Sequence, residues 1–591
     1  MPRRIPGLVV ASLALLATSS LEVQVPLLSS EPTPAIRGPL IEVGAGQWNL
    51  SVGPEPDSTS HLVFDTVASL LQRWPNTRYR NGHNVVPGII PVGTLIYHGR
   101  ETQEIPNGPE WVAMDPELSR GFCVGFGESG CWHLTFVSTR PLKVLYFDGS
   151  SGAKMAGGSL DTQDYVAWNK SHPEWVLNER KRIADLCHWG KKYNLDGLFR
   201  YVHLFFSEIM VCDFTSGVQL VSSIQLNPES EPWFRSGDIP PTPTRGYVPP
   251  QSSLWLEYKM VEAGTWYHFY PGEGRVKLDL TRLISFYDTD MFPSLIPLRS
   301  GLDRLQHRVA GISDRDVQQF HQRLDEVLQD YHSSESSSFT SGSVDWRTLY
   351  QVTRDRYADR LQILQYILSA TDPTAENYSK NHTQTASNAM YRLQLMLTTY
   401  ALQTARPPTL DTGVDKDLSW ASPVYQYCAT THTSALYPFK ASFTKSEHLL
   451  LSALEGTNRE ICRVIVRLWA EGIEAGVDPG LPLWPIGRGD GNVTDEYWLP
   501  MLKHWKNDVE GLMSWLEWSI WLKCRPTCDM EEICYMPTWP WFKNTPWPTF
   551  DSAPRAKGSL APGLGDPDEE EWRNPLPRCI RRMEPFDWRN P

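Results

Sequence analysis

Four side chains have types and positions that suit one kind of chemistry. His98 ends a β-prone run and is followed at once by a glycine, which leaves backbone room for a ligand beside the imidazole. Glu208 stands inside the apolar run Phe205–Cys212, where an unpaired carboxylate is costly to bury. Trp111 and Phe122 lie between them in the sequence and offer aromatic faces. Together the four predict a cleft with a ring-stacking surface and one negative charge that stabilises developing positive charge.

Each residue also has a structural interpretation, and the residues alone leave both open. A histidine at the end of a strand is commonly a hydrogen-bonded structural group. Glu208 can instead pair with a nearby arginine or lysine, or its strand can be an exposed edge. The spacing of the four positions does not choose between these alternatives.

The elements that must position these side chains follow an α+β pattern. One short strand is expected to end at His98, and DPELSRGFC, which follows the next strand, has helical character. Asp196-Gly197 between apolar residues predicts a tight turn shortly before Glu208. The remaining expected elements are strands at Pro109–Met114, Trp132–Val137, Leu142–Phe147 and Gln219–Leu226 and a helix within Trp175–Trp189.

Tyr97-His98-Gly99 resembles the first motif of the ADP-ribosyltransferase fold in its His–Tyr–Glu branch, the branch of the poly(ADP-ribose) polymerases. In that family a strand ends in aromatic-His-Gly, a middle motif lies on a following strand and helix, and a third motif begins with the catalytic glutamate. The run Ser207–Asp213 is similar to the third motif, and Leu195-Asp196-Gly197 is similar to the turn that many relatives place before it. The resemblance covers roughly residues 80–225.

The resemblance implies a split β-sheet, NAD as substrate, and a role for each residue that matches a motif. His98 would hydrogen-bond the hydroxyls of the nicotinamide-side ribose, and Gly99 would let backbone groups clamp the carboxamide. Glu208 would bind the ribose 2′-hydroxyl and stabilise the oxocarbenium-like centre as nicotinamide leaves. Where relatives carry a tyrosine in the middle motif, this chain has Trp111 on the strand and Phe122 on the helix, which can stack on a ring but offer no phenol.

Two functions therefore stand side by side. One is a secreted ADP-ribosyltransferase or NAD glycohydrolase, with an acceptor, protein or small molecule, that the sequence does not identify. The other is a catalytically inactive secreted binding or cell-surface protein that keeps the fold, which the missing phenol favours. The net charge of -13 and the lack of a sustained basic run argue against a general nucleic-acid binder, because affinity for phosphates needs a basic face.

Three features predict export. Arg3 and Arg4 precede the apolar stretch Leu8–Ala17 and the small residues Ala17-Thr18-Ser19, the order of a secretory signal that is removed near residue 20. That stretch is too short for a comfortable membrane span, and no second candidate is present, so the mature chain is expected to have none. An uncleaved signal anchor is the alternative. The ten cysteines suit disulfides, and glycosylation sequons stand at Asn49, Asn169, Asn377, Asn381 and Asn492.

The composition along the chain predicts two folded parts. After the signal (1–20) and a loose lead-in (21–60) comes the ADP-ribosyltransferase-like α+β domain (61–226). A proline-rich connector with a β-rich extension and a helix fills 227–331, and a serine-rich linker spans 332–345. A mainly α-helical C-terminal domain follows over 346–545, with Thr444 and Glu447 spaced as a capping box, and the tail 546–591 is expected to be disordered.

The cysteines are expected to form disulfides rather than a metal site. Cys524, Cys528, Cys534 and Cys579 have a spacing that a metal ion can use, but no histidine accompanies them, and export favours oxidation. Cys123 with Cys131, and Cys187 with Cys212, are candidate pairs near the cleft. The Trp- and Pro-rich stretch that follows Cys534 is expected to pack over the helices rather than to bind sugar.

Overall fold

The structure is a computed structural model, and the chain divides into two compact units, Met1–Asn49 and Leu50–Pro591. All that follows concerns the second unit. The structure describes residues 48–122, 131–155, 157–203, 206–226, 262–265, 268, 271–333, 344–407, 418–477, 495–536, 538 and 574–583.

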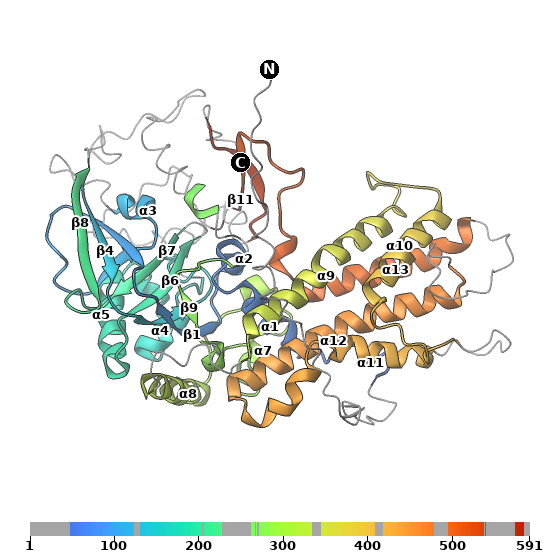
Figure 1. Cartoon of the computed structure of the whole chain (residues 1–591), viewed down its shortest axis with the longest axis horizontal. Helices are drawn as coiled ribbons and strands as arrows, with labels where there is room; N and C mark the ends of the chain where they lie inside the picture. The colour runs from blue at the N-terminus through green and yellow to red at the C-terminus, as the bar shows by residue number, and fades with distance from the viewer. Residues whose placement is uncertain are drawn as a thin grey trace, which may run out of the picture. The chain divides into compact units, whose positions relative to one another are not determined.

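A mixed β-sheet dominates the N-terminal half of this unit (Figure 1). Its described strands follow the order β10-β1-β5-β6-β7-β3-β2-β4-β8, and β9 also pairs with β1. The β5–β6 pair is parallel, and the other pairs are antiparallel. The bounds are β1 Asn84–Ile90, β2 Leu95–Arg100, β3 Glu110–Ala113, β4 Cys131–Ser138, β5 Leu142–Phe147, β6 Gly197–His203, β7 Phe206–Val211, β8 Val218–Leu226, β9 Lys277–Leu278 and β10 Ile284–Ser285. The strands expected around His98 and Glu208 are confirmed.

The junction between β2 and β3 is the weakest join in the sheet. These strands share the single register pair Tyr97↔Ala113, whereas β2 and β4 are paired along the whole of β2, from Leu95 to Arg100. The sheet is therefore one hydrogen-bonded layer that divides into a β2-β4-β8 part and a β3-β7-β6-β5-β1 part.

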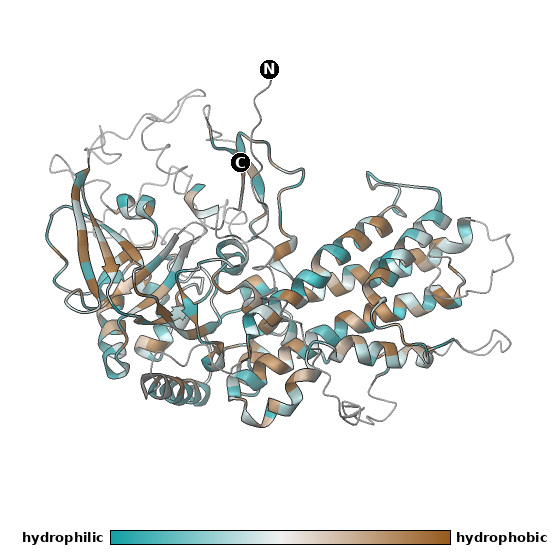
Figure 2. Ribbon diagram, viewed as in Figure 1, coloured by the Kyte–Doolittle hydropathy of each residue, from teal (hydrophilic) through white to brown (hydrophobic). Residues whose placement is uncertain are grey.

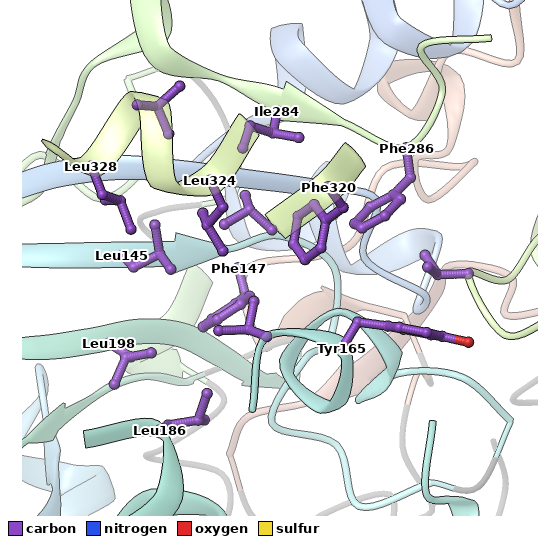
Figure 3. Packing of buried hydrophobic residues seen from close by; sticks show 14 of the residues in the cluster. Leu145, Phe147, Tyr165, Leu186, Leu198, Ile284, Phe286, Phe320, Leu324 and Leu328 are labelled. Atoms are coloured by element: carbon purple, nitrogen blue, oxygen red, sulfur yellow. The ribbon is translucent and has the colours of Figure 1, made fainter. Parts of the chain in front are cut away.

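The main core of the N-terminal half lies on one face of the second part of the sheet. Leu145, Phe147 and Leu198 point from β5 and β6 toward three helices, α4 (Asp161–Trp168), α5 (Glu179–Gly190) and α8 (Asp314–Ser333) (Figure 3). Alternate residues of a strand share a face, and residues three or four apart share the face of a helix. The apolar face of these strands therefore packs against the apolar faces of the three helices. Each such buried side chain contributes about 1.5–3 kcal/mol relative to leaving it exposed. The stripe on α8 consists of Val317, Phe320, Leu324 and Leu328.

The β-rich extension expected within residues 227–331 was predicted over 254–285, and the described residues of that stretch contain less β-structure than expected. Among the described residues of that stretch, only β9 and β10 are strands, and 262–265 are helical. Asp279 separates the two short strands, because its carboxylate accepts the Thr281 amide and starts a single 3-10 turn. Both strands pair with β1, so this stretch extends the sheet.

The C-terminal half is mainly α-helical, as the sequence predicts. Figure 2 shows brown apolar and teal polar residues alternating along these helices. Two sets of apolar residues recur at helical spacing in the sequence of this half. Ile461, Ile465, Leu468 and Trp469 are buried on one helix, and Leu502, Trp505, Val509, Leu512 and Leu516 are buried on another, so these residues belong to the core, whereas Ile520, which continues the second set, is half-buried in a 3-10 turn beyond the helix. The helices are α9 Trp346–Ser369, α10 His382–Leu397, α11 Ser422–Thr430, α12 Lys445–Glu474 and α13 Asp495–Leu516.

The termini of two of these helices show how capping decides a boundary. Thr444 accepts the Glu447 amide while the Glu447 side chain accepts the Thr444 amide, so the predicted capping box opens α12. Apolar residues at three- and four-residue steps over Tyr391–Ala405 predict a helix there, but the helix spans His382–Leu397. Asn381 accepts the Gln384 amide and so starts α10 nine residues earlier than the apolar spacing indicates.

Helix α1 (Ser60–Ser69) packs against the helical half, although it precedes the sheet in the chain. The Phe64 and Tyr350 rings stack at 4.9 Å, and Arg354 of α9 donates to the Ala68 carbonyl at 3.2 Å. The Asp65 carboxylate pairs with Arg304 at 2.9 Å, and both side chains are almost fully buried. The two halves therefore share one continuous interior.

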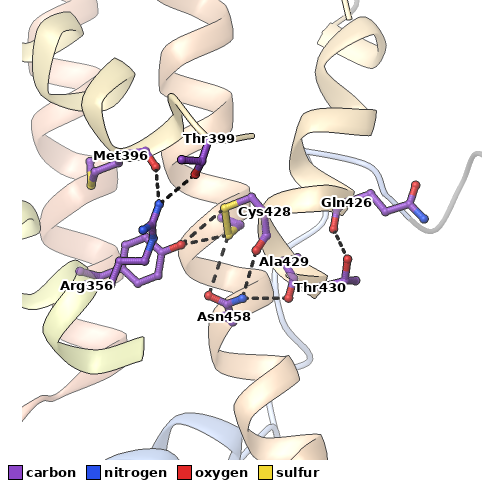
Figure 4. Close-up of a disulfide and its surroundings, with 10 residues drawn as sticks. Arg356, Met396, Thr399, Gln426, Cys428, Ala429, Thr430 and Asn458 are labelled. Carbon is purple, nitrogen blue, oxygen red and sulfur yellow. Dashed lines mark hydrogen bonds between the residues drawn. A yellow bond between two sulfur atoms is a disulfide. The ribbon is translucent and has the colours of Figure 1, made fainter. Parts of the chain in front are cut away.

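The described cysteines form disulfides and not a metal site. Cys187 is joined to Cys212, Cys524 to Cys534 and Cys528 to Cys579. Cys131 is also disulfide-bonded, and its expected partner Cys123 lies outside the described residues. The fourth described pair, Cys428–Cys462, joins α11 to α12 beside the Tyr357 hydroxyl (Figure 4). Because Cys524, Cys528 and Cys579 are all bonded to another sulfur, their mutual closeness does not make them metal ligands.

In the part of the chain that the structure describes, no helix has the length and apolar character needed to cross a bilayer.

Candidate functional site

The three strands that carry the predicted site residues are neighbours in the sheet. β2 carries His98, β3 carries Trp111 and β7 carries Glu208, and the strand order is β7-β3-β2. Ala113 is the register partner of both Glu208 and Tyr97, so these three positions form one row across the sheet. Residues more than a hundred positions apart are thereby brought onto adjacent strands.

His98 is buried and has a free nitrogen. Its neighbours on β2, Ile96 and Gly99, are buried, and the residue itself is 6% exposed. Burial, assisted by the positive charge of Arg100, lowers the pKa of the imidazole to about 4, although a hydrogen bond with the Trp111 backbone opposes this shift. The ring is therefore neutral at pH 7. Within the described residues, its Nδ1 atom has no hydrogen-bond partner.

Glu208 is held in a buried ion pair. The Arg200 guanidinium, on the neighbouring strand β6, donates from Nε to the Glu208 carboxylate at 2.8 Å. The side chains are 1% and 6% exposed. Burial raises the pKa of the Glu208 carboxyl above its usual range, and the charge of Arg200 counteracts part of that rise. Of the alternatives that the sequence leaves open, the structure shows the pairing with an arginine.

Arg200 connects Glu208 to a larger buried network. Its guanidinium binds Glu179, at the start of α5, at 2.5 Å and donates to the Gln163 amide oxygen of α4 at 2.9 Å. Burial acts to raise the pKa of Glu179, but the charges of Arg200, Arg182 and Lys154 together outweigh it and lower that pKa to about 2. Arg200 thus divides its donors between Glu208 and a carboxylate that Arg182 also binds, at 2.8 Å. The face of the Trp111 indole lies 3.6 Å from the guanidinium and covers it.

The two aromatic residues of the middle motif have different surroundings. One face of Trp111 is occupied by Arg200, and its indole Nε1–H has no partner among the described residues. Phe122 follows helix α3 (Pro116–Gly121), and its ring centroid lies 6.0 Å from that of His98. Phe122 is therefore the aromatic ring beside the imidazole, and Trp111 is the ring beside the ion pair.

The imidazole and the carboxylate are near in the sheet but do not contact each other. Successive side chains of a strand point to opposite faces, so the His98 side chain leaves β2 on the face opposite to the one that Tyr97 shares with Glu208. The charges that act on His98 are those of Arg100 and His133, and those that act on Glu208 are Arg200, Glu179 and Lys154. A ligand that uses both groups therefore has to pass through the sheet at the β2–β3 junction, where the two strands share a single register pair.

A second group of buried charges fixes the start of α3. Asp115 directly follows β3 and precedes α3, and it pairs with Arg73 of α2 (Arg73–Arg78) and with Arg275 at 3.0 Å. Arg275 also binds Glu273 at 2.6 Å. These contacts hold the β3–α3 connection, and with it Phe122, close to β2.

Sequence reasoning did not identify Arg200, Glu179 or Gln163 as parts of this site. Arg200 lies inside the apolar strand GLFRYVH and eight residues before Glu208, which is a usable signal for a cross-strand ion pair in a hairpin. Glu179 and Gln163 carry no comparable signal, because their helices reach Arg200 only through tertiary packing.

Comparisons with known proteins identify relatives without a described activity. The family model described as "YPL277C N-terminal domain" matches residues 56–133 and 126–233, a region that contains strands β1 to β8. The chain is 23% identical to the uncharacterized protein YOR389W of Saccharomyces cerevisiae in an alignment 556 residues long that covers 81% of each chain. It is 29% identical to the uncharacterized yeast protein YPL277C in an alignment 214 residues long that covers 28% of this chain and 43% of that protein. No solved structure matches the chain.

Proposed function

We propose that the protein is an exported NAD-cleaving enzyme, an ADP-ribosyltransferase or NAD glycohydrolase, that acts at the junction of β2, β3 and β7. The observation that carries the proposal is the adjacency of these three strands, since the three motifs that resemble the family lie on them in that order. The two reactions share the cleavage of the nicotinamide–ribose bond and differ in the acceptor.

The neutral, buried imidazole of His98 supports the proposal. Its unpartnered Nδ1 can accept a hydrogen bond from a ribose hydroxyl, a bond that would compensate for the burial of that atom. Gly99 beside it lets a carboxamide approach the backbone, and the Phe122 ring is near enough to contact a nicotinamide ring. In this scheme NAD is consumed as a substrate, and no metal ion takes part.

Glu208 has to supply the negative charge that stabilises the oxocarbenium-like centre. In the structure that charge is shared with Arg200 at 2.8 Å. A bound substrate would have to draw the carboxylate from Arg200 to the ribose 2′-hydroxyl, and Glu179 would then retain the guanidinium at 2.5 Å. Arg200 is thus a positioning residue, because it holds the Glu208 carboxylate on β7 through a direct hydrogen bond.

The second candidate is a catalytically inactive exported binding or cell-surface protein that keeps this sheet. The buried Arg200–Glu208 pair favours it, because a carboxylate that is 6% exposed and already paired serves stability without any substrate. The absence of a phenol at Trp111 and Phe122 points the same way.

The experiment is to incubate the purified protein with NAD and to measure free nicotinamide. The enzyme should release nicotinamide, and Glu208→Gln should reduce the rate by about 100-fold or more, the usual effect of removing a group that stabilises a transition-state charge. Glu496→Gln changes an exposed glutamate of α13 and serves as the matched control. The far-ultraviolet circular dichroism spectrum of Glu208→Gln must match that of the parent, so that lost activity is not lost folding.

The outcomes separate the two candidates. Release by the parent and by Glu496→Gln, but not by Glu208→Gln, supports the enzyme. If no protein releases nicotinamide above the Glu208→Gln level, the enzymatic proposal is wrong and the inactive protein remains. Export is tested separately, because a mature chain that starts near residue 20 is expected, and a cytosolic chain with an intact Met1 would contradict it.

A further inference from the structure

The glycosylation sequons differ in how the folded chain uses the asparagine amide. A glycan is attached to Nδ2 and is bulky, so the folded chain accommodates it only where this nitrogen is reachable and makes no contact that the sugar would displace. Asn169, Asn377 and Asn381 lie in the described part of the second unit, and Asn492 lies outside the described residues. The printed contacts of the three side chains distinguish them.

Asn169 is exposed and makes no side-chain hydrogen bond among the described residues. It caps α4 in the left-handed conformation, with φ 58° and ψ 15°, and only its backbone amide is used, to the Tyr165 carbonyl at 3.2 Å. Asparagine adopts this conformation more readily than most residues. The amide of Asn169 therefore stands in solvent at a turn.

Asn381 is exposed and uses only its amide oxygen. Its Oδ1 atom accepts the Gln384 backbone amide at 2.9 Å and thereby caps α10. An N-cap needs an acceptor and no donor, so a sugar on Nδ2 leaves the cap intact. The capping function and a glycan are compatible at this position.

Asn377 is half buried and uses both ends of its amide. Its Nδ2 donates to the Tyr366 carbonyl at 2.6 Å, and its Oδ1 accepts the Ser369 hydroxyl at 3.1 Å. These bonds tie the loop before α10 to the last turn of α9. A sugar on Nδ2 would replace one of its two hydrogens and would lie against the carbonyl that the nitrogen now contacts.

We propose that the exported chain carries N-linked glycans at Asn169 and Asn381 and retains an unmodified Asn377. The proposal rests on export, which belongs to the proposed function. In the transfer, Nδ2 forms a bond to the anomeric carbon of a lipid-diphosphate-linked oligosaccharide. The bond from that carbon to the diphosphate breaks, the lipid diphosphate leaves, and Nδ2 loses one proton.

The test expresses the full chain in a eukaryotic secretory host and removes N-glycans with a glycosidase in ¹⁸O-labelled water. This treatment converts each glycosylated asparagine into ¹⁸O-labelled aspartate. Trypsin cleaves after Lys380 and so separates Asn377 from Asn381 into the peptides 361–380 and 381–392. Mass spectrometry should find the label at Asn169 and Asn381 and not at Asn377.

Two sequon variants serve as controls. Thr383→Ala removes the sequon of Asn381 but keeps its N-cap oxygen, and it should lower the mass of the protein by one glycan. Ser379→Ala removes the sequon of Asn377 and should leave the mass of the carbohydrate unchanged. Label at Asn377, or its absence from Asn169 or Asn381, overturns the proposal.

A second arm separates this proposal from that of export. Here the secretion signal of another exported protein replaces residues 1–20, so the chain enters the secretory route whether or not its own N-terminus directs it there. If only this arm yields glycans, and at Asn169 and Asn381, export by the native N-terminus is wrong while the choice of sites stands. If this arm yields label at Asn377, or none at Asn169 or Asn381, the choice of sites is wrong.

Discussion

Replacing Arg200 by methionine removes the cation that binds two buried carboxylates, of which Glu179 keeps a second partner, Arg182, at 2.8 Å. Arg200 binds Glu208 at 2.8 Å and Glu179 at 2.5 Å, and the three side chains are 1%, 6% and 11% exposed. Methionine fills a similar length of space without charge and is unbranched, so it fits irregular gaps. The substitution therefore tests electrostatics more than packing.

The expected loss of stability is large because the charges left behind are buried. Removing one partner of a buried ion pair costs about 3–5 kcal/mol. Loss of the contact between the guanidinium and the Trp111 ring, at 3.6 Å, adds about 0.5–2 kcal/mol. Arg200→Met should thus lower the free energy of unfolding at pH 7 by about 3.5–7 kcal/mol.

Urea unfolding followed by tryptophan fluorescence measures this change. Adding Glu208→Gln to Arg200→Met should recover part of the loss, because the amide leaves no unpaired charge on β7. The control is Lys192→Gln, which removes a pair with Asp325 whose side chains are 54% and 45% exposed, and it should cost less than about 1 kcal/mol. Two results would contradict the stabilising role of the network. One is that Arg200→Met costs no more than Lys192→Gln, and the other is that Glu208→Gln lowers the stability of Arg200→Met as much as it lowers that of the parent.

Three further predictions concern stability. Burial lowers the pKa of His61 to about 3 and of His307 to about 4, from 6.5. Stability is therefore full above pH 6.5 and falls toward pH 4, by up to about 1.4 kcal/mol per pH unit for each histidine; equal urea midpoints at pH 7.5 and 5 would contradict this. Thr444→Ala should cost about 1 kcal/mol in the same assay, and Thr444→Ser very little, whereas equal losses would argue against the cap. Changing Cys428 and Cys462 together to serine should lower the free energy of unfolding by about 3–4 kcal/mol, because the two cysteines are 34 residues apart. An unchanged urea midpoint would contradict a stabilising role of this disulfide.

The strands and helices with strong periodicity could be predicted from the sequence. Alternating apolar residues located β4 and β5 within one or two residues, and the stripe at Ile461, Ile465, Leu468 and Trp469 located the core face of α12. The Thr444–Glu447 box marked the first residue of α12 because capping is a local interaction. These local signals predict an N-terminal half built on a β-sheet and a C-terminal half built of helices.

The partners of Glu208 could not be predicted, because they depend on tertiary register. The hairpin of β6 and β7 sets Arg200 opposite Glu208, and the packing of α5 on the sheet brings Glu179 to the same guanidinium. Likewise β10 joins β1 across two hundred residues of sequence, a pairing for which the two-residue strand carries no signal of its own. Local patterns give the elements, and the contacts between distant elements decide which charges meet.

The most direct test of the proposed NAD site is a crystal structure with a bound carbocyclic NAD analogue, which resists cleavage. The account predicts that the ribose 2′-hydroxyl lies within hydrogen-bond distance of the Glu208 carboxylate, with the nicotinamide ring beside Gly99 and Phe122. It also predicts that Arg200 stays bound to Glu179. An analogue that binds elsewhere, or a structure in which Glu208 remains on Arg200 with no ligand at β2, β3 and β7, would contradict it.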